Sequence, residues 1–337
     1  MSRSLTARCA DLVEDLALGC AADLREVTPL TGGVASDIAA IRVGDARYCV
    51  KFALPKLKVV AEWRAPVHRN AAEYAWLSVA AKIAPDNAVR LFGRSETAHG
   101  FAMEYVSGAE AYLWKGALLA GQRPQGEAHA VGDLVGRLHA ASTAPGFDTS
   151  AFQNRDDFRA LRIEPYLTFT AARHPGVSPQ LTALSDELYR SAQVLVHGDV
   201  SPKNILMRQS GPVILDAECA TMGDAAFDPS FCINHLVLKA VHLPAQRAAL
   251  LDEVAAFWAA YARHVSWEDT GALEARICRL LPALMLARVD GKSPVEYLGA
   301  AQQAQVRQLA LPLIAEPAPT LDTFLQELTV RLKDERT

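Results

Sequence analysis

Apolar residues in the first third of the chain follow two different spacings. Residues 5–24 place them at intervals of three and four, which predicts an amphipathic helix, and residues 70–77 predict a second helix. The other apolar stretches are short and bounded by turn residues, as strands are, with Gly44-Asp45 as the clearest hairpin signal. The predicted strands occupy residues 26–30, 38–43, 46–54, 89–95 and 100–105. This part of the chain therefore predicts a mainly antiparallel sheet accompanied by helices.

Beyond residue 108 the spacing becomes helical over most of the length. Two short apolar runs, 194–197 and 212–217, interrupt the helices and predict strands or strand edges. Residues 312–319 are rich in proline and are interpreted as a connector. The predicted helices occupy residues 127–142, one or two segments within 150–192 with a break at 174–176, and residues 228–242, 245–264, 268–288 and 321–333. Strands early and helices late indicate an α+β protein.

Composition narrows the class of protein. The 337 residues are half hydrophobic and carry a formal net charge of −4, which is ordinary for a globular protein and argues against nucleic acid as the main partner. The six cysteines are scattered, with neither a C-x-x-C pair nor a zinc-like spacing, so we expect free thiols in a reducing compartment. No apolar run has the length of a membrane span or a signal-peptide core, so we expect a cytoplasmic protein without a membrane partner. Composition leaves the oligomeric state open.

The candidate chemistry concentrates in residues 193–220. Asp199 follows a His-Gly pair after the first short apolar run, Asn204 comes five residues later, and Asp216 ends the second run. Two acids and an amide thus lie on tight loops at the ends of short strands. Phosphoryl transfer needs such groups, because one carboxylate, Asp199, can orient an attacking hydroxyl and take its proton. Asn204 and Asp216 supply the hard oxygen ligands that Mg²⁺ prefers.

The pattern H-G-D-x-x-x-x-N at residues 197–204 resembles the kinase catalytic loop, in the form typical of the aminoglycoside phosphotransferase and choline kinase group. Residues 223–228 are similar to that group's Gly-Asp-Pro-x-x-Asp segment, with Ala225 in place of the usual proline. The resemblance implies a bilobal protein-kinase-like fold. Its N-terminal nucleotide-binding lobe, residues 1–107, would be an antiparallel sheet plus helix, and its C-terminal lobe, residues 108–337, mainly helical. ATP and Mg²⁺ are the implied cofactors, and the implied catalytic residues are Asp199, Asn204 and Asp216.

The resemblance also implies residues that hold the nucleotide. Lys51 matches the lysine that binds the α- and β-phosphates and pairs with a helix glutamate, here Glu73 or Glu62. Without such a partner, Lys51 would be interpreted as a solvent-facing lysine of an edge strand. A short glycine loop would approach the phosphates, and the segment between the lobes, with its boundary near Ser107-Gly108, would meet the adenine. The implied residues of the loop and the adenine site are Gly32, Gly33, Ser36, Met103, Glu104 and Val106.

Polar residues around the catalytic stretch have predicted supporting roles. Glu218 could bind a metal through water, but a salt bridge is the preferred interpretation. His197 is expected to fix the loop by hydrogen bonding rather than to handle the reacting proton. Asp228 is expected to cap the helix that follows it and to bond back to the loop.

The spacing between two aspartates bears on the acceptor. Twelve residues separate Asp216 from Asp228, which leaves no room for the long activation segment on which protein kinases bind peptides. A small-molecule hydroxyl acceptor, such as a sugar, thio-sugar, amino alcohol or aminoglycoside, is therefore favoured over a protein. A catalytically silent nucleotide-binding scaffold is the alternative from another class. Polar residues near 290 are candidates for acceptor contacts, although Ser293 and Glu296 are also typical of a capped helix start. The candidate substrate residues are Asp199, Lys203, Arg288, Asp290 and Lys292.

Overall fold

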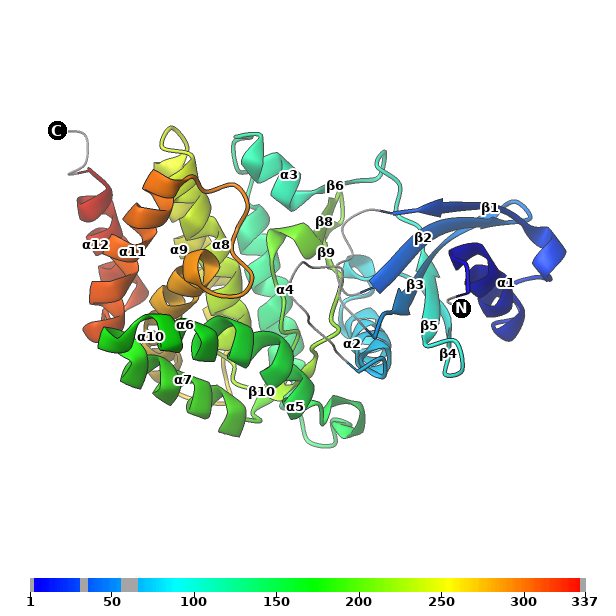
Figure 1. Cartoon of the computed structure of the whole chain (residues 1–337), viewed down its shortest axis with the longest axis horizontal. Coiled ribbons are helices and arrows are strands. Elements are labelled where there is room, and N and C mark those ends of the chain that lie inside the picture. Colours follow the sequence, from blue (N-terminus) through cyan, green and yellow to red (C-terminus); the bar gives the residue numbers. More distant parts are fainter. Residues whose placement is uncertain (1–2, 31–35, 56–65, 334–337) are drawn as a thin grey trace.

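The computed structural model describes residues 3–30, 36–55 and 66–333. An antiparallel sheet lies at one end of an elongated molecule and a large group of helices at the other (Figure 1). The order of the sheet is β1-β2-β3-β5-β4, so the bilobal α+β fold expected from the sequence is confirmed. The elements of this lobe are α1 (Leu5–Asp15), β1 (Leu24–Pro29), β2 (Ser36–Val43), β3 (Ala46–Ala53), α2 (Arg69–Ile83), β4 (Leu91–Ser95) and β5 (Gly100–Glu104).

Strand β3 sends alternate side chains to the two faces of the sheet. Val50 and Phe52 join a buried cluster with Leu12 of α1 on one face. Cys49 packs with the core that α2 contributes, and Lys51 reaches the same helix on the opposite face. Lys51 is therefore a buried residue of a central strand, not a solvent-facing lysine at an edge.

Helix α1 is shorter than its apolar spacing predicts. It ends at Asp15, and Ala17 adopts a φ of 52°, in the left-handed region that ends helices. The apolar residues that continue the spacing, Leu16 and Leu18, pack against the sheet instead. The prediction of helix up to residue 24 is wrong because this contact with the sheet replaces the last helical turns.

The C-terminal lobe is mainly helical. Two small antiparallel sheets carry the catalytic stretch: β6 (Ala111–Leu113), β8 (Ile205–Arg208) and β9 (Gly211–Ile214) in the order β6-β8-β9, and β7 (Val194–Val196) with β10 (Thr221–Gly223). Its α-helices are α3 (Trp114–Leu119), α4 (Glu127–Ser142), α5 (Arg155–Phe158), α6 (Phe169–Arg173), α7 (Ser178–Arg190), α8 (Phe227–His242), α9 (Arg247–Ala262), α10 (Thr270–Asp290), α11 (Ala300–Ala315) and α12 (Leu321–Lys333). A π-helical segment, η4 (Arg159–Thr168), joins α5 to α6 without a break. Short 3₁₀ turns include η2 (Pro85–Asn87) and η6 (Pro202–Asn204).

The connector predicted at residues 312–319 is wrong in its first part. Helix α11 continues through Pro312 and ends at Ala315. A proline inside a helix removes one hydrogen bond and costs about 3 kcal/mol. The helix buries Leu309, Leu313 and Ile314 on either side of the proline, and this burial offsets the cost.

The capped helix start considered for Ser293 and Glu296 is not formed. Residues 291–299 are irregular, and the next helix begins only after Gly299. The hydroxyl of Ser293 accepts a hydrogen bond from Arg288 at 3.0 Å, and Glu296 forms a salt bridge with Lys115. Both side chains are thus engaged with partners outside any cap.

Helix α4 crosses the lobe beside α9, and glycine permits the close approach. A Cβ atom on Gly132 would lie 2.3 Å from the carbonyl oxygen of Phe257, and one on Gly136 would lie 3.0 Å from that of Tyr261. This packing places the C-terminal end of α4 beside β7, where the catalytic loop begins.

The chain leaves the large sheet at Glu104 and joins a C-terminal sheet at Ala111. The boundary predicted at Ser107-Gly108 lies between these two residues and stays a proposal. Among the described residues, no helix has both the length and the apolar character needed to cross a membrane.

Candidate active site

The loop that carries Asp199 is anchored in the core by Asp228. The carboxylate of Asp228 accepts hydrogen bonds from the backbone N–H groups of His197, at 2.7 Å, and of Gly198, at 2.9 Å. Gly198 has a φ of 83°, and a Cβ atom there would lie 2.9 Å from the Cβ of Cys219. The middle residue of the His-Gly-Asp pattern must therefore be glycine. The predicted bond from Asp228 back to the loop is confirmed, whereas its side chain forms no capping bond with α8.

His197 is fixed in one tautomer. The backbone N–H of Asp199 donates to its Nδ1 at 3.0 Å, so the ring proton is on Nε2, which donates to the carbonyl of Leu215 at 3.1 Å. Burial lowers the pKa of His197, which keeps the ring neutral. Both ring nitrogens are occupied by backbone groups, and the predicted structural role of His197 is confirmed.

Two cations hold Asp199 in its ionised form. Its Oδ2 lies 3.1 Å from Nη2 of Arg162 and 3.1 Å from Nζ of Lys203. Burial opposes ionisation, but Lys203 and Arg162 outweigh it and hold the pKa of Asp199 well below its ordinary range. Oδ1 is buried without a hydrogen-bond partner among the described residues. One oxygen is thus neutralised, while the other makes no hydrogen bond among the described residues and is available to an incoming donor; the nearby hydroxyl of Ser201 adds to the lowering of the Asp199 pKa.

Asn204 and Asp216 lie at the neighbouring ends of β8 and β9. The N–H of Leu215 donates to the carbonyl of Asn204 at 2.9 Å, which continues the β8–β9 ladder to the residue before Asp216. The side-chain Nδ2 of Asn204 donates to the carbonyl of Asp199 at 3.1 Å. Asp216 has a φ of 72°, which is uncommon outside glycine and typical of functional positions. One short hairpin therefore brings the three predicted catalytic residues together.

Lys51 lies between two carboxylates. Its Nζ is 2.7 Å from Oε1 of Glu73 and also contacts Oδ1 of Asp216. Burial favours the neutral amine, but Asp216 and Glu73 outweigh it and raise the pKa of Lys51 above its ordinary value. Burial raises the pKa of Glu73 to about 7, and the field of Lys51 limits this rise. Glu73 is thus the observed partner of Lys51, and its rival Glu62 lies outside the described residues.

Two buried arginines outside the predicted catalytic set complete the site. Arg69, in the first turn of α2, donates from Nε to Glu218 at 2.8 Å, which confirms the predicted salt bridge of Glu218. Arg162, on η4, contacts the carbonyl of Gly198 in addition to Asp199. Each arginine meets a partner far away in sequence, so no local spacing could have found it. Arg69 on α2 and Arg162 on η4 therefore fix the catalytic segment through side chains that belong to other elements.

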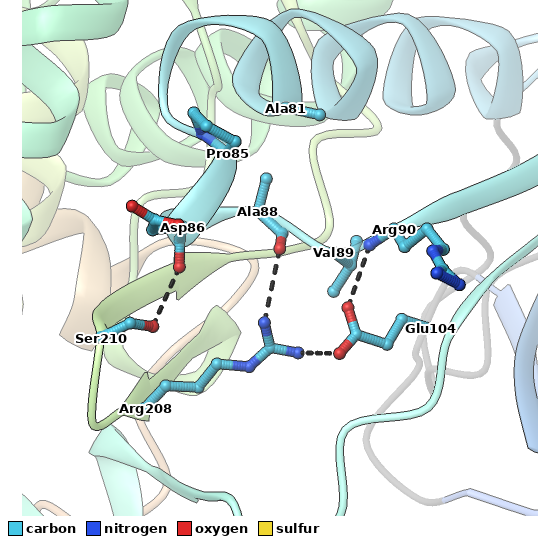
Figure 2. Close-up of a pocket in the computed structure, with 9 residues that line it drawn as sticks. All are labelled: Ala81, Pro85, Asp86, Ala88, Val89, Arg90, Glu104, Arg208 and Ser210. Atoms are coloured by element: carbon cyan, nitrogen blue, oxygen red, sulfur yellow. Dashed lines mark hydrogen bonds and ion pairs between the residues drawn. The ribbon is translucent and has the colours of Figure 1, made fainter.

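The end of β5 is fastened to the C-terminal lobe through Glu104. Its carboxylate accepts from Nη2 of Arg208 at 2.7 Å and from the N–H of Arg90 at 3.0 Å. Figure 2 shows these bonds, together with Ser210 reaching the carbonyl of Asp86 across the same surface pocket of about 460 Å³. The N–H of Glu104 donates to the carbonyl of Arg90 at 2.8 Å, which fastens the end of β5 further.

The other residues implied for nucleotide binding have varied positions. Gly32 and Gly33 lie outside the described residues. Ser36 is buried at the start of β2, and Met103 is buried in β5, where it belongs to the core that α2 and the C-terminal lobe share. Val106 is partly buried in the segment between the lobes.

The three substrate candidates near residue 290 differ in their surroundings. Arg288 is buried and reaches the hydroxyl of Tyr166 at 3.2 Å. The carboxylate of Asp290 is already bound by Arg307, with two contacts of 2.8 Å, and by His174. Lys292 is exposed, with its Nζ 5.6 Å from the centre of a phenylalanine ring. Of these three candidates, only Arg288 combines burial with a donor, Nε, that has no partner among the described residues.

The donor set fits a magnesium ion that shares its coordination shell with phosphates. Asp216 offers a carboxylate, and Asn204 keeps its Oδ1 because Nδ2 is the atom that binds Asp199. Among the described residues no three His, Cys, Asp or Glu side chains gather as an all-protein metal site. Mg²⁺ keeps several waters and typically binds through one or two protein ligands plus substrate phosphates, so the two oxygen donors of Asp216 and Asn204 fit it.

Comparisons with known proteins agree with this geometry. A family model described as the phosphotransferase enzyme family matches residues 26–267. No curated protein matches. Among solved structures, the chain is similar to an amicoumacin kinase in complex with AMP-PNP, Ca²⁺ and Ami, with 15% identity and a TM-score of 0.54 over 95% of this chain and 98% of that one. It is also similar to an ethanolamine kinase of Plasmodium vivax, with 11% identity and a TM-score of 0.50 over 100% of this chain and 90% of that one. Both likenesses concern the fold, while the family match covers most of the sequence: the chain belongs to the phosphotransferase enzyme family.

Proposed function

We propose that this phosphotransferase moves the γ-phosphate of ATP, with Mg²⁺, to a hydroxyl group of a small molecule. The observation that carries the proposal is an unbroken path of contacts. Lys51 contacts Asp216, the residue before Asp216 is bonded to Asn204, and Asn204 is bonded to Asp199. The proposed phosphate-binding cation, metal ligands and base are thus gathered in one site, as the positioning of a phosphoryl transfer requires.

Asp199 is the proposed catalytic residue. Its free Oδ1 would accept a hydrogen bond from the acceptor hydroxyl and take the proton as the oxygen–phosphorus bond forms. The bond from the γ-phosphorus to its bridging oxygen breaks, and ADP leaves with the electron pair. The low pKa makes Asp199 a weak base, which suffices because phosphoryl transfer depends mainly on positioning and charge neutralisation.

The cationic residues would stabilise the phosphates. Lys51 would hold the α- and β-phosphates, with Glu73 keeping its ammonium in place. Lys203, beside Asp199, would lie close to the transferred phosphoryl group. Asp216 and Asn204 would bind Mg²⁺, which supplies charge neutralisation when bound. The similar amicoumacin kinase structure, with AMP-PNP and Ca²⁺, supports a nucleotide and a divalent cation in this fold.

The remaining nucleotide contacts follow the resemblance. The carbonyl of Glu104 and the backbone of Val106 would meet the adenine edge, and Met103 would line its pocket. Gly32, Gly33 and Ser36 would belong to the loop over the phosphates. We also place the protein in the cytoplasm, because its six cysteines are free, as expected in a reducing compartment.

The test measures ADP release with Mg²⁺-ATP against sugars, sugar acids, amino alcohols and aminoglycosides. Asp199→Asn should lose turnover by about 10²-fold or more while keeping its affinity for the nucleotide. Asp186→Asn, an exposed aspartate on α7, is the matched control and should retain activity. Nucleotide binding without ADP release for any acceptor would instead favour the silent scaffold.

A further inference from the structure

A group of buried side chains beside the catalytic loop is not used by the proposed transfer step. Helix α8 contributes His235 and Lys239, which are one helical turn apart on the same face. Arg288 of α10 donates to the hydroxyl of Tyr166 at 3.2 Å, and Nζ of Lys239 lies 5.1 Å from the ring centre of Tyr297. These five residues are called the basic cluster here.

The segment η4 connects the basic cluster to Asp199. It carries Arg162, which binds Asp199, and four residues later Tyr166, which binds Arg288. Positions four apart in a helical segment lie about one turn from each other. The segment η4 thus links the arginine that holds the proposed base to the tyrosine that binds Arg288.

The basic cluster contains two cations without a counter-charge. Lys239 is 1% exposed and Arg288 is 8% exposed, and no carboxylate of the described residues forms a salt bridge with either of them. The hydrogen bond of the Lys239 ammonium is a long one, 3.4 Å, to the carbonyl of His235 in its own helix. Nε of Arg288 and the hydroxyl of Tyr297 are buried without partners in the described part of the chain. Buried donors of this kind normally have an acceptor.

Nearby carboxylates do not supply a counter-charge to Lys239 or Arg288, because each is bound to another cation. Glu296 is bound to Lys115 at 2.5 Å, and Asp290 is bound to Arg307 at 2.8 Å. Burial, reinforced by Lys115 and Arg288, lowers the pKa of Lys239 to about 7.

The pKa of His235 is affected by the same surplus of positive charge. Burial lowers its pKa well below the ordinary value, and Arg288 and Lys239 lower it further. The charge of Asp199 raises the pKa of His235 instead. The ring is therefore affected by the charges of both the basic cluster and the proposed base. A site with this charge attracts anions and repels cations.

We propose that the acceptor carries an anionic group, a carboxylate or a phosphate, which binds between Lys239 and Arg288 while its hydroxyl reaches Asp199. This inference rests on the proposed function and narrows its substrate class. Sugar acids, hydroxy acids and sugar phosphates fit this charge. Polycationic aminoglycosides and amino alcohols would bring a second positive charge to Lys239 and Arg288.

Binding tests the inference independently of turnover. The probes are two matched series: glycerate, glycerol 3-phosphate, glycerol and 3-amino-1,2-propanediol, then gluconate, glucose 6-phosphate, glucose and glucosamine. Each is titrated calorimetrically into the full chain saturated with Mg²⁺ and AMP-PNP. In at least one series an anionic member should bind about tenfold or more tightly than the neutral member, as a charge-assisted hydrogen bond provides. Within that series, comparing the affinity of the carboxylate probe with that of the phosphate probe identifies which anionic group the site binds.

Variants assign this binding to the basic cluster. Lys239→Met and Arg288→Met should each remove the preference for the anionic probe. Lys82→Met and Arg279→Met carry the same substitutions at an exposed and a partly exposed position, on α2 and α10, and should keep it. Equal binding of neutral and anionic members, absence of binding by every anionic member, or anion binding that survives both cluster variants would each overturn the inference.

ADP release with the same probes separates the two proposals. Anionic probes that bind in a Lys239-dependent way without releasing ADP would leave the anion site standing and refute the kinase activity on them. Turnover confined to neutral or amino probes, and unchanged in Lys239→Met, would leave the kinase standing and refute the anion site.

Discussion

Replacing Lys239 by methionine should make the protein without acceptor more stable. Lys239 is a nearly fully buried ammonium without a salt bridge to any described residue, in a helix whose residues 227–241 are all buried. A buried charge without a counter-charge destabilises the folded state. Methionine has a similar length and fills the same space without a charge, so the packing of α8 is largely kept.

The size and pH dependence of this effect follow from the pKa of Lys239. Burial, Lys115 and Arg288 lower it from 10.5 to about 7. The unfolded chain therefore binds more protons than the folded chain between these pH values, and wild-type stability rises with pH through this window. Below pH 7 the destabilisation is fully present. A tenfold change in an ionisation constant corresponds to about 1.4 kcal/mol, so Lys239 destabilises the fold by about 4 kcal/mol at pH 7.

The assay is denaturant unfolding of wild type and Lys239→Met at pH 7, 8, 9 and 10, under reducing conditions and without acceptor. The variant should be more stable by about 4 kcal/mol at pH 7, and this advantage should shrink towards zero as the pH approaches 10.5. Lys82→Met, at an exposed position, serves as the control and should show no such trend. A variant less stable than wild type at pH 7, or an advantage that does not change with pH, would refute the reasoning.

Three further predictions concern the catalytic residues and the packing behind them. Asp216→Ala should abolish Mg²⁺-dependent turnover, and unchanged ADP release would exclude a metal role for this residue. Lys203→Met removes one of the cations that lower the pKa of Asp199. The acidic limb of the pH profile of kcat/KM should therefore move to higher pH. A limb that does not move would contradict the assignment of Asp199 as the base. Gly132→Ala should destabilise the protein by about 2 kcal/mol or more, because the new Cβ would overlap the backbone of α9. Gly116→Ala in α3 has open space around its Cβ and should be neutral or mildly stabilising. Equal unfolding free energies for the two variants would contradict the packing of α4 on α9.

The arrangement of the catalytic hairpin could be predicted from the sequence because its determinants are local. Asp199, Asn204 and Asp216 lie within eighteen residues, and two short strands and their turns decide where the three side chains go. Strand and helix types were also predictable for most of the chain, since apolar period and turn residues agree there. Lys51 could be placed because β-strand alternation puts it on the face opposite Val50 and Phe52.

The residues that the sequence did not reveal act through contacts distant along the chain. Arg162 meets Asp199 across thirty-seven residues, and Arg69 meets Glu218 across one hundred and forty-nine. Their partners depend on how η4 and α2 pack, which no local pattern encodes. The prediction of a connector starting at Pro312 is wrong for the opposite reason. A proline is a strong local signal for a helix end, but the burial of α11 residues on both sides of Pro312 overrides it.

Lys239 differs from these cases, because a signal for it was present in the sequence. Helix 227–242 is rich in apolar residues and is buried on all sides, and a lysine in its last turn is then out of place. A charge at such a position either finds a buried counter-charge or lowers stability for the sake of a ligand. The described residues supply no salt bridge to Lys239, and its neighbour in the cluster, Arg288, binds the uncharged groups of Tyr166 and Ser293 but no carboxylate among them. Two adjacent buried cations without counter-charges lower stability, and groups that do so are concentrated at functional sites. Their joint presence beside η4, the segment that also holds the proposed base, is therefore the strongest physical reason to search for this enzyme's acceptor among anions.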